Sequence, residues 1–144
     1  MTGRARALVH SDGASSGNPG AAGVGAVVEF GGKVYEVSES IGVTTNNVAE
    51  YRAFILGLEK ALRLGAEEVE ARVDSELLVK QLTGAYRVKA PGLVELHEKA
   101  RGLLASFRKA SVVHVPRAEN KKADALAKKA AAQAKARTTS HQPL

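Results

Sequence analysis

The chain is 144 residues long, 44% hydrophobic and 25% charged, which is typical of one folded domain and excludes a disordered or fibrous protein. It has no cysteine, so disulfides, thiolate nucleophiles and cysteine-ligated zinc are excluded, and any metal must be held by oxygen or imidazole. No apolar run approaches the roughly 20 residues of a membrane span. The net charge is +6, and the positive charge lies in the second half of the chain. This charge is equally compatible with a polyanionic partner and with a solvated surface.

The first 43 residues are predicted to form three strands in an antiparallel meander. Alternating residues predict a strand over 4–12, which ends at Asp12 and is followed by a turn-rich segment over 13–20. Two further strands are expected over 21–30 and 33–43. Gly31 and Gly32 separate them, and such a pair favours a two-residue hairpin loop because glycine readily adopts positive φ.

A helix is predicted next, because the pattern changes to helical spacing. Tyr51, Phe54, Ile55, Leu58 and Leu62 recur at i, i+3, i+4, i+7 and i+11. The preceding asparagines at 46 and 47 are candidate N-caps, and the glycine at 65 is expected to end the helix.

The remaining elements alternate between short strands and helices. A strand over 69–74 is followed by a helix over 75–82, a helix opens at Pro91, and a strand is expected over 112–115. An alanine-rich helix is predicted from 120 to about 135, and no periodicity remains beyond about 136, so a disordered tail is expected there. The order β-β-β-α-β-α-α-β-α predicts an α/β (α+β) fold, with a five-stranded mixed sheet and helices packed on both faces.

Four acidic residues lie at predicted element ends: Asp12, Glu50, Asp74 and Asp124. Each has a structural explanation. Asp12 before a glycine suits a turn, Glu50 suits a capping box with Asn47, and Asp74 suits an N-cap. Asp124 suits the positive end of a helix dipole.

Together, the four acids favour a metal site. In a sheet of this order the first and fourth strands can be neighbours, which would bring Asp12 and Asp74 together, and two helix starts could add Glu50 and Asp124. Clustered carboxylates repel one another unless divalent cations neutralise them. Oxygen ligands favour Mg²⁺, with Mn²⁺ as a substitute, and a pair of such ions is typical of displacement at phosphorus.

The residues around these acids resemble those of the type 1 ribonuclease H family. The matching segments, in family order, are Ser11-Asp12-Gly13, Gly17-Asn18-Pro19-Gly20, Thr45-Asn46-Asn47-Val48-Ala49-Glu50, Val73-Asp74-Ser75 and Glu119-Asn120-Lys121-Lys122-Ala123-Asp124-Ala125-Leu126-Ala127. The resemblance assigns residues 1–132 to a ribonuclease H domain and leaves 133–144 as the end of the last helix and the tail.

The resemblance implies hydrolysis of the RNA strand of RNA/DNA hybrids by two Mg²⁺ ions, giving 5′-phosphate and 3′-hydroxyl ends. It makes the four acids catalytic metal ligands. Asn18, Asn46 and Asn47 would read the minor groove, where the 2′-hydroxyl distinguishes RNA from DNA. Thr45 would contact a DNA phosphate, and Ser15 and Arg117 are further substrate-binding candidates.

The chain departs from the family pattern in two places. Many members carry a histidine on a loop before the last helix, where this chain has Arg117, while His114 falls at a predicted strand position. The basic helical protrusion of some members is absent, leaving Arg87 and Lys89 as candidate DNA contacts, and Glu76 replaces a frequent glutamine.

Rival interpretations are a non-catalytic nucleic-acid-binding module of the same fold and a related nuclease acting on DNA or also on double-stranded RNA. Retention of all four acids argues against the first, and the asparagines argue for the hybrid over DNA. We expect a cytoplasmic monomer that binds hybrid and has no membrane partner.

Overall fold

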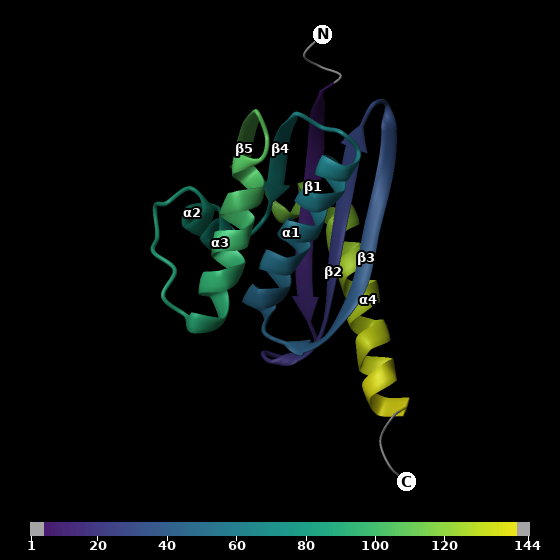
Figure 1. The fold of residues 1–144 in the computed structure, drawn as a ribbon. Coiled ribbons are helices and arrows are strands. Elements are labelled where there is room, and N and C mark those ends of the chain that lie inside the picture. Colours follow the sequence, from purple (N-terminus) through teal and green to yellow (C-terminus); the bar gives the residue numbers. More distant parts are fainter. Residues whose placement is uncertain (1–4, 141–144) are drawn as a thin grey trace.

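The computed structural model describes residues 5–140 and contains a five-stranded sheet with helices on both faces (Figure 1). The elements, in chain order, are β1 (Arg6–Ser15), β2 (Gly20–Phe30), β3 (Lys33–Thr44), α1 (Asn46–Arg63), β4 (Glu68–Val73), α2 (Glu76–Leu82), α3 (Pro91–Ala105), β5 (Lys109–His114) and α4 (Lys121–Ser140). A 3-10 turn, Arg117–Glu119, precedes α4. The predicted fold class and element order are confirmed.

The sheet has the strand order β3-β2-β1-β4-β5. β2 pairs antiparallel with β1 and β3, whereas β4 pairs parallel with β1 and β5 pairs parallel with β4, as the helical crossovers require. Gly31 and Gly32 adopt φ of 62° and 78°, so the predicted two-residue hairpin is confirmed. Because β1 and β4 are parallel neighbours, their carboxyl ends lie together.

The predicted end of the first strand and the predicted N-cap of the first helix were wrong. β1 continues to Ser15 because Gly13–Ser15 still pair with β2, with Gly13 opposite Val24 and Ser15 opposite Ala22. Asp12 therefore lies inside the strand and not in a turn. The N-cap of α1 is Thr45, whose hydroxyl accepts a hydrogen bond from the Val48 amide, so neither predicted asparagine caps the helix.

Three later boundaries also differ from prediction. Ser75 and not Asp74 caps α2, and β5 begins at Lys109 and ends at His114, which places His114 in a strand as expected. α4 continues to Ser140, beyond the predicted end near Lys135. The last residues of the predicted tail, 141–144, lie outside the described part of the chain.

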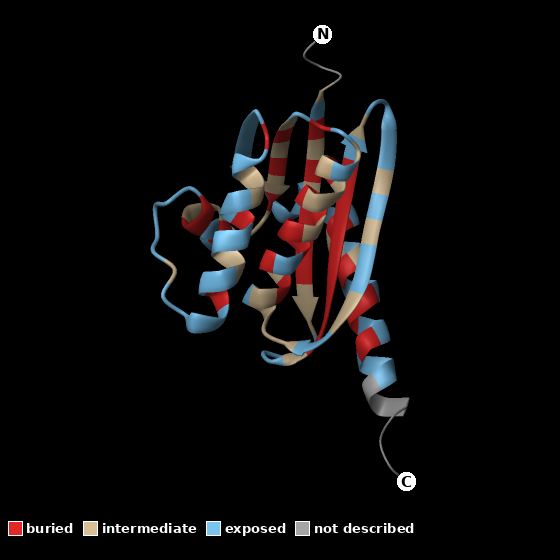
Figure 2. Cartoon of the chain, viewed as in Figure 1, coloured by how far each residue is buried: buried red, intermediate tan, exposed pale blue. Residues whose placement is uncertain are grey.

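The main core lies between the sheet and α1 (Figure 2). Tyr51, Phe54 and Leu58 from the predicted apolar stripe are at most 1% exposed, and they pack with Val9 and Val28 of the sheet. Each such side chain contributes about 2 kcal/mol through burial. This packing fixes α1 on the face of β1 and so determines where the helix start lies relative to Asp12.

The opposite face of the sheet carries α4 at very short range. A Cβ added at Gly25 would lie 2.4 Å from the Ala123 carbonyl oxygen, and one added at Gly23 would lie 2.3 Å from the Ala131 amide nitrogen. Ser38 Oγ also donates to the Leu126 carbonyl oxygen at 2.9 Å. Glycine and alanine at these positions therefore let the helix backbone rest directly on β2.

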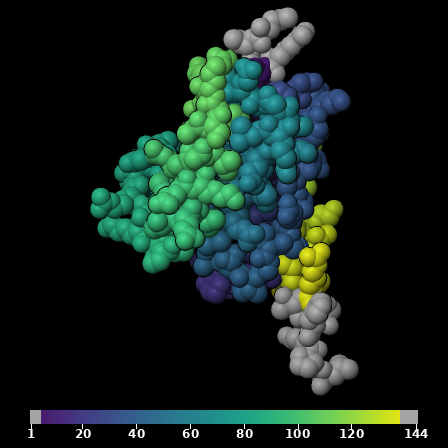
Figure 3. Space-filling model, viewed as in Figure 1, coloured from purple at the N-terminus to yellow at the C-terminus, as the bar shows by residue number. Residues whose placement is uncertain are grey.

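The segment comprising α2 and α3 extends to one side of the molecule, as the space-filling view shows (Figure 3). Within residues 5–140, none of the helices is both long enough and apolar enough to cross a membrane.

Candidate active site

Four carboxylates, three from separate elements and one from the loop after β4, line one cavity of about 210 Å³. Asp12 comes from the interior of β1, and Asp74 directly follows β4, the parallel neighbour of β1. Glu50 lies near the start of α1, and Asp124 lies in the first turn of α4. Ser15, Asn46, Arg117 and Lys128 also line the cavity. The structure thus brings the four acids together as the sequence predicted.

The start of α1 is fixed by side chains from two neighbouring loops. Asn18 Oδ1 accepts a hydrogen bond from the Asn46 amide at 3.1 Å, which satisfies one of the free N–H groups of the helix N-terminus. Asn46 Nδ2 in turn donates to Glu50 Oε1 at 3.4 Å, and Ser75 also hydrogen-bonds the Glu50 carboxylate. These contacts hold the Glu50 carboxylate on the side of the cavity near Asp74.

A buried asparagine ties α4 to β1. Asn120 is 1% exposed, and its Nδ2 donates to the Ser11 carbonyl oxygen at 3.0 Å. The backbone carbonyl oxygen of Asn120 accepts a hydrogen bond from the Asp124 amide at 3.0 Å. Asn120 therefore links the residue before Asp12 to the helix turn that carries Asp124. Asn120 belongs to one of the motifs named above, but this role was not predicted because it depends on a contact between residues distant in sequence.

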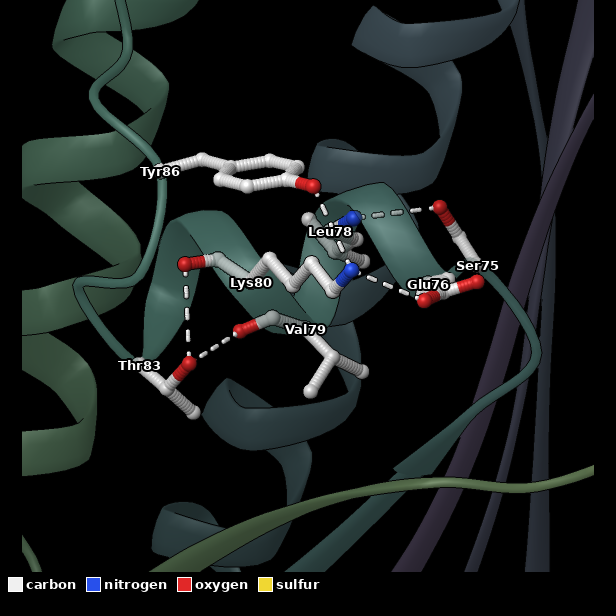
Figure 4. A network of polar contacts seen from close by, with 7 residues as sticks. All are labelled: Ser75, Glu76, Leu78, Val79, Lys80, Thr83 and Tyr86. Atoms are coloured by element: carbon white, nitrogen blue, oxygen red, sulfur yellow. Dashed lines mark hydrogen bonds and ion pairs between the residues drawn. The ribbon is translucent and has the colours of Figure 1, made fainter.

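A polar network orders the segment that follows Asp74 (Figure 4). Ser75 Oγ accepts from the Leu78 amide at 3.1 Å and starts α2. Lys80 Nζ lies 2.9 Å from Glu76 Oε1 and 3.2 Å from the Tyr86 hydroxyl, and it also lies over the Tyr86 ring. The network holds α2 and the loop after it against each other, beside the strand end that carries Asp74.

The acidic cluster shifts the pKa values of its members in opposite directions. Burial, a hydrogen bond with Asp124 and the charge of Asp74 raise the pKa of Asp12 to about 8. Burial likewise raises the pKa of Glu50 to about 7, although the Ser75 hydrogen bond opposes this. Burial also acts to raise the pKa of Asp124, but hydrogen bonds from Lys128 and Asp12 hold it below its usual range. Without a cation, Asp12 therefore keeps a proton that Asp124 does not.

We expect the metal-free protein to lose stability as the pH rises. The Asp12 carboxyl titrates near 3.8 when unfolded and at about 8 when folded, so in this interval folding takes up a proton. The free energy of unfolding therefore falls as the pH increases between these values. Thermal unfolding in chelator across this range measures the effect. Asp12→Asn should flatten the slope, and an equally steep slope in this variant would contradict the assignment to Asp12.

The donor set suits a hard divalent cation. Within residues 5–140, no three acidic or histidine side chains are arranged so that they could hold a metal ion as they stand. Glu50 is turned to Ser75 and Asn46, and Asp124 to Lys128. Mg²⁺ usually takes only one or two protein carboxylates and completes its shell with water and substrate phosphate. Converging carboxylates around a cavity, with Asp12 buried and without a cation partner, fit this mode of binding.

Three of the six predicted substrate-binding residues line the cavity, whereas Asn18 and Thr45 do not. Ser15, Asn46 and Arg117 line it directly, and Arg117 lies close enough for its charge to lower the pKa of Asp124. Asn47, exposed at the start of α1, does not line it. Neither does His114, at the end of β5. Lys128 also lines the cavity and was not predicted to lie at the acids, although its spacing of four residues from Asp124 on a helix indicates contact.

Comparison with known proteins gives matches over most of the chain. Residues 10–130 match the family described as Reverse transcriptase-like. The chain is 49% identical over 127 residues to Ribonuclease HI of Halobacterium salinarum, covering 87% of this chain and 64% of that protein. It is 45% identical over 125 residues to the bifunctional protein Rv2228c of Mycobacterium tuberculosis, covering 85% of this chain and 34% of that protein. The chain thus spans less than two thirds of the length of either relative.

Solved structures show the same fold. The N-terminal RNase H domain of the mycobacterial protein superimposes with a TM-score of 0.88 at 44% identity, covering 93% of this chain and 98% of that structure. LC11-RNase H1 from compost, solved in complex with an RNA/DNA hybrid, superimposes with a TM-score of 0.81 at 41% identity, covering 89% of this chain and 98% of that structure.

Proposed function

Because this chain belongs to the type 1 ribonuclease H family, we propose that it is an endoribonuclease that hydrolyses the RNA strand of RNA/DNA hybrids. The products would carry 5′-phosphate and 3′-hydroxyl ends. The observation that carries the proposal is the convergence of four carboxylates on one cavity, beside the loops that carry Asn18 and Asn46. The existence of a 41% identical relative in complex with an RNA/DNA hybrid supports the choice of substrate.

The four acids would act as ligands for two divalent ions, Mg²⁺ or in its place Mn²⁺. When bound, these ions supply an activated water and a stabilised leaving 3′-oxygen. Asp12 interacts electrostatically with Asp74, Glu50 and Asp124, so it is the carboxylate best placed to contribute to both ions. Ser75 and Asn46 hydrogen-bond Glu50 in the metal-free protein, so the Glu50 carboxylate would turn away from them to ligate an ion.

The asparagines at the edge of the cavity would read the substrate. The amide oxygen of Asn18 is already occupied by the Asn46 amide, so its side-chain NH₂ is the group left to contact a base or ribose oxygen. Asn47 is exposed at the start of α1 and would contact the minor groove. The Thr45 hydroxyl accepts from the Val48 amide and can still donate its own proton to a phosphate of the DNA strand.

Cleavage of end-labelled duplexes tests the proposal directly. Hybrid, duplex RNA and duplex DNA of one sequence are incubated with Mg²⁺, with Mn²⁺ and with chelator, and the ends of the products are identified. We expect metal-dependent cleavage within the RNA strand of the hybrid. Cleavage of duplex RNA as well would extend the substrate range, and cleavage of DNA would identify a different nuclease. Binding without cleavage in both metals would identify a non-catalytic module.

Hybrid affinity is expected to fall steeply with salt. Arg87, Lys89 and the two lysines that begin α4, Lys121 and Lys122, offer phosphate contacts, and each contact releases condensed counterions from the duplex. Between roughly 50 and 200 mM salt, a few such contacts lower affinity on the order of tenfold to a hundredfold. Fluorescence anisotropy of labelled hybrid with the Asp12→Asn variant measures binding without turnover. An affinity independent of salt would show that these cations do not contact the duplex.

The expectations of a monomer, a cytoplasmic location and the boundary of the domain at residue 132 stay predictions. Arg117 is proposed to contact a substrate phosphate, since it lines the cavity and lies near Asp124.

A further inference from the structure

Two cationic side chains, Arg117 and Lys128, line the acidic cavity, and Lys128 forms an ion pair there. Lys128 lines the cavity, and its Nζ is 3.0 Å from Asp124 Oδ2. The two residues are one turn apart on α4, and both side chains retain solvent exposure, at 68% and 23%. Such pairs contribute little to stability. The position of this pair matters for a different reason, because Asp124 belongs to the carboxylate cluster.

The cluster is divided by this contact. Within residues 5–140, ion pairs are observed at Asp124 but not at Asp12, Glu50 or Asp74. The Asp12 carboxylate accepts from the Gly13 amide, and Glu50 accepts from the neutral Asn46 side chain. Arg117 adds a second positive charge near Asp124. One half of the cluster is therefore neutralised by a lysine of the protein, while Asp12, Glu50 and Asp74 have no ion-paired side chain within the described residues.

We propose that Lys128 is a tethered counter-ion: it neutralises Asp124 while divalent ions are absent, and it must leave Asp124 when that carboxylate ligates a metal. The inference rests on the proposed function in one respect, the assignment of Asp124 as a metal ligand. It follows that the two halves of the cluster bind metal unequally. The half formed by Asp12, Glu50 and Asp74 fills first, and Lys128 sets the concentration at which the Asp124 half fills.

The expected size of the effect comes from electrostatic repulsion. An ammonium group a few ångströms from a divalent ion at a partly solvated site weakens metal binding on the order of tenfold. Removing the ammonium should therefore tighten the weaker metal-binding step by about that factor. The same change should slightly destabilise the metal-free protein, because Asp124 loses its partner beside Asp12. The two effects have opposite signs, which a purely structural role of Lys128 would not produce.

The test measures metal binding to the full chain without substrate. Mn²⁺ is titrated into the wild type, Lys128→Met, Lys128→Arg and Lys129→Met by calorimetry, and thermal unfolding is followed with and without Mn²⁺. Methionine keeps the length and apolar character of the side chain but removes the charge. Lys129 is the matched control because it is exposed, adjacent on α4 and in no observed ion pair within the described residues.

We expect Lys128→Met alone to bind Mn²⁺ more tightly at the weaker step and to melt lower without metal, while Lys128→Arg resembles the wild type. Equal shifts in Lys128→Met and Lys129→Met would overturn the proposal, because they would reflect bulk charge. Unchanged metal binding with weakened hybrid binding would also overturn it and make Lys128 a phosphate contact. In either case wild-type cleavage of hybrid would stand, whereas an inactive wild type would refute the proposed function itself.

Discussion

Asp12→Asn is expected to abolish hybrid cleavage while leaving the fold intact. Asp12 is 9% exposed in the middle of the cluster and interacts with all three other acids, so its loss affects both metal positions at once. Loss of several kcal/mol of transition-state stabilisation lowers the rate on the order of 10³-fold or more. Initial rates on labelled hybrid in saturating Mg²⁺ measure the effect, and circular dichroism verifies the fold.

The structure also predicts that this inactive variant is the more stable protein when metal is absent. Asparagine removes the charge that repels Asp74 and Asp124, so the metal-free variant should melt several degrees above the wild type at mildly alkaline pH. Glu95→Gln is the matched control, since it makes the same chemical change on the exposed face of α3. A rate for Asp12→Asn within tenfold of the Glu95→Gln rate would remove Asp12 from the catalytic site.

Opposed effects on stability and activity are expected wherever a site is built from groups that disfavour one another. Here the cost is visible as a proton retained on Asp12 at neutral pH. The substrate is a polyanion and the metal is a cation. The charge of the bound cation stabilises the ionised carboxylates that burial destabilises. Metal binding is therefore expected to stabilise the folded protein most at the pH where the metal-free protein is weakest.

The sequence predicted the juxtaposition of the acids because it depends on topology. Hairpin signals at Gly31 and Gly32, a helical stripe through Tyr51 and Leu58, and short strands separated by helices leave few arrangements of the sheet. Once β1 and β4 are parallel neighbours, Asp12 and Asp74 must meet. The roles of these residues in metal binding and catalysis stay predictions.

Contacts between distant residues were less accessible to prediction. The Asn120 side chain is buried against the Ser11 backbone, 109 positions away, and no local pattern marks that contact. The predicted end of β1 was wrong because the glycine at 13 and the serine at 15 are residue types that are common in turns. In the structure, pairing with β2 satisfies the backbone hydrogen-bonding groups of these residues. The contact between Lys128 and Asp124 could have been predicted from the sequence, because a spacing of four residues is that of an ion pair on a helix.

Gly13→Ala is expected to be the most disruptive substitution of a small residue near the site. A Cβ at this position would lie 2.2 Å from the Ala49 carbonyl carbon and 2.4 Å from the Glu50 amide nitrogen. Both atoms belong to the backbone of α1, so the clash cannot be relieved by rotating a side chain. Either β1 or α1 must move, at a cost of about 3 kcal/mol or more in the free energy of unfolding.

Any movement of α1 also separates Glu50 from Asp12, so Gly13→Ala should lose both stability and activity, unlike Asp12→Asn. Chemical denaturation and cleavage rates, measured in parallel, distinguish the two variants. Gly102→Ala is the control: this glycine is exposed on α3, and apart from its chain neighbours and the adjacent backbone of the helix, no atom lies within 4 Å of an added Cβ. Alanine should there stabilise the helix by about 0.5–1 kcal/mol. A Gly13→Ala variant with wild-type stability would mean that α1 does not lie against β1 at the distance that the carboxylate cluster requires.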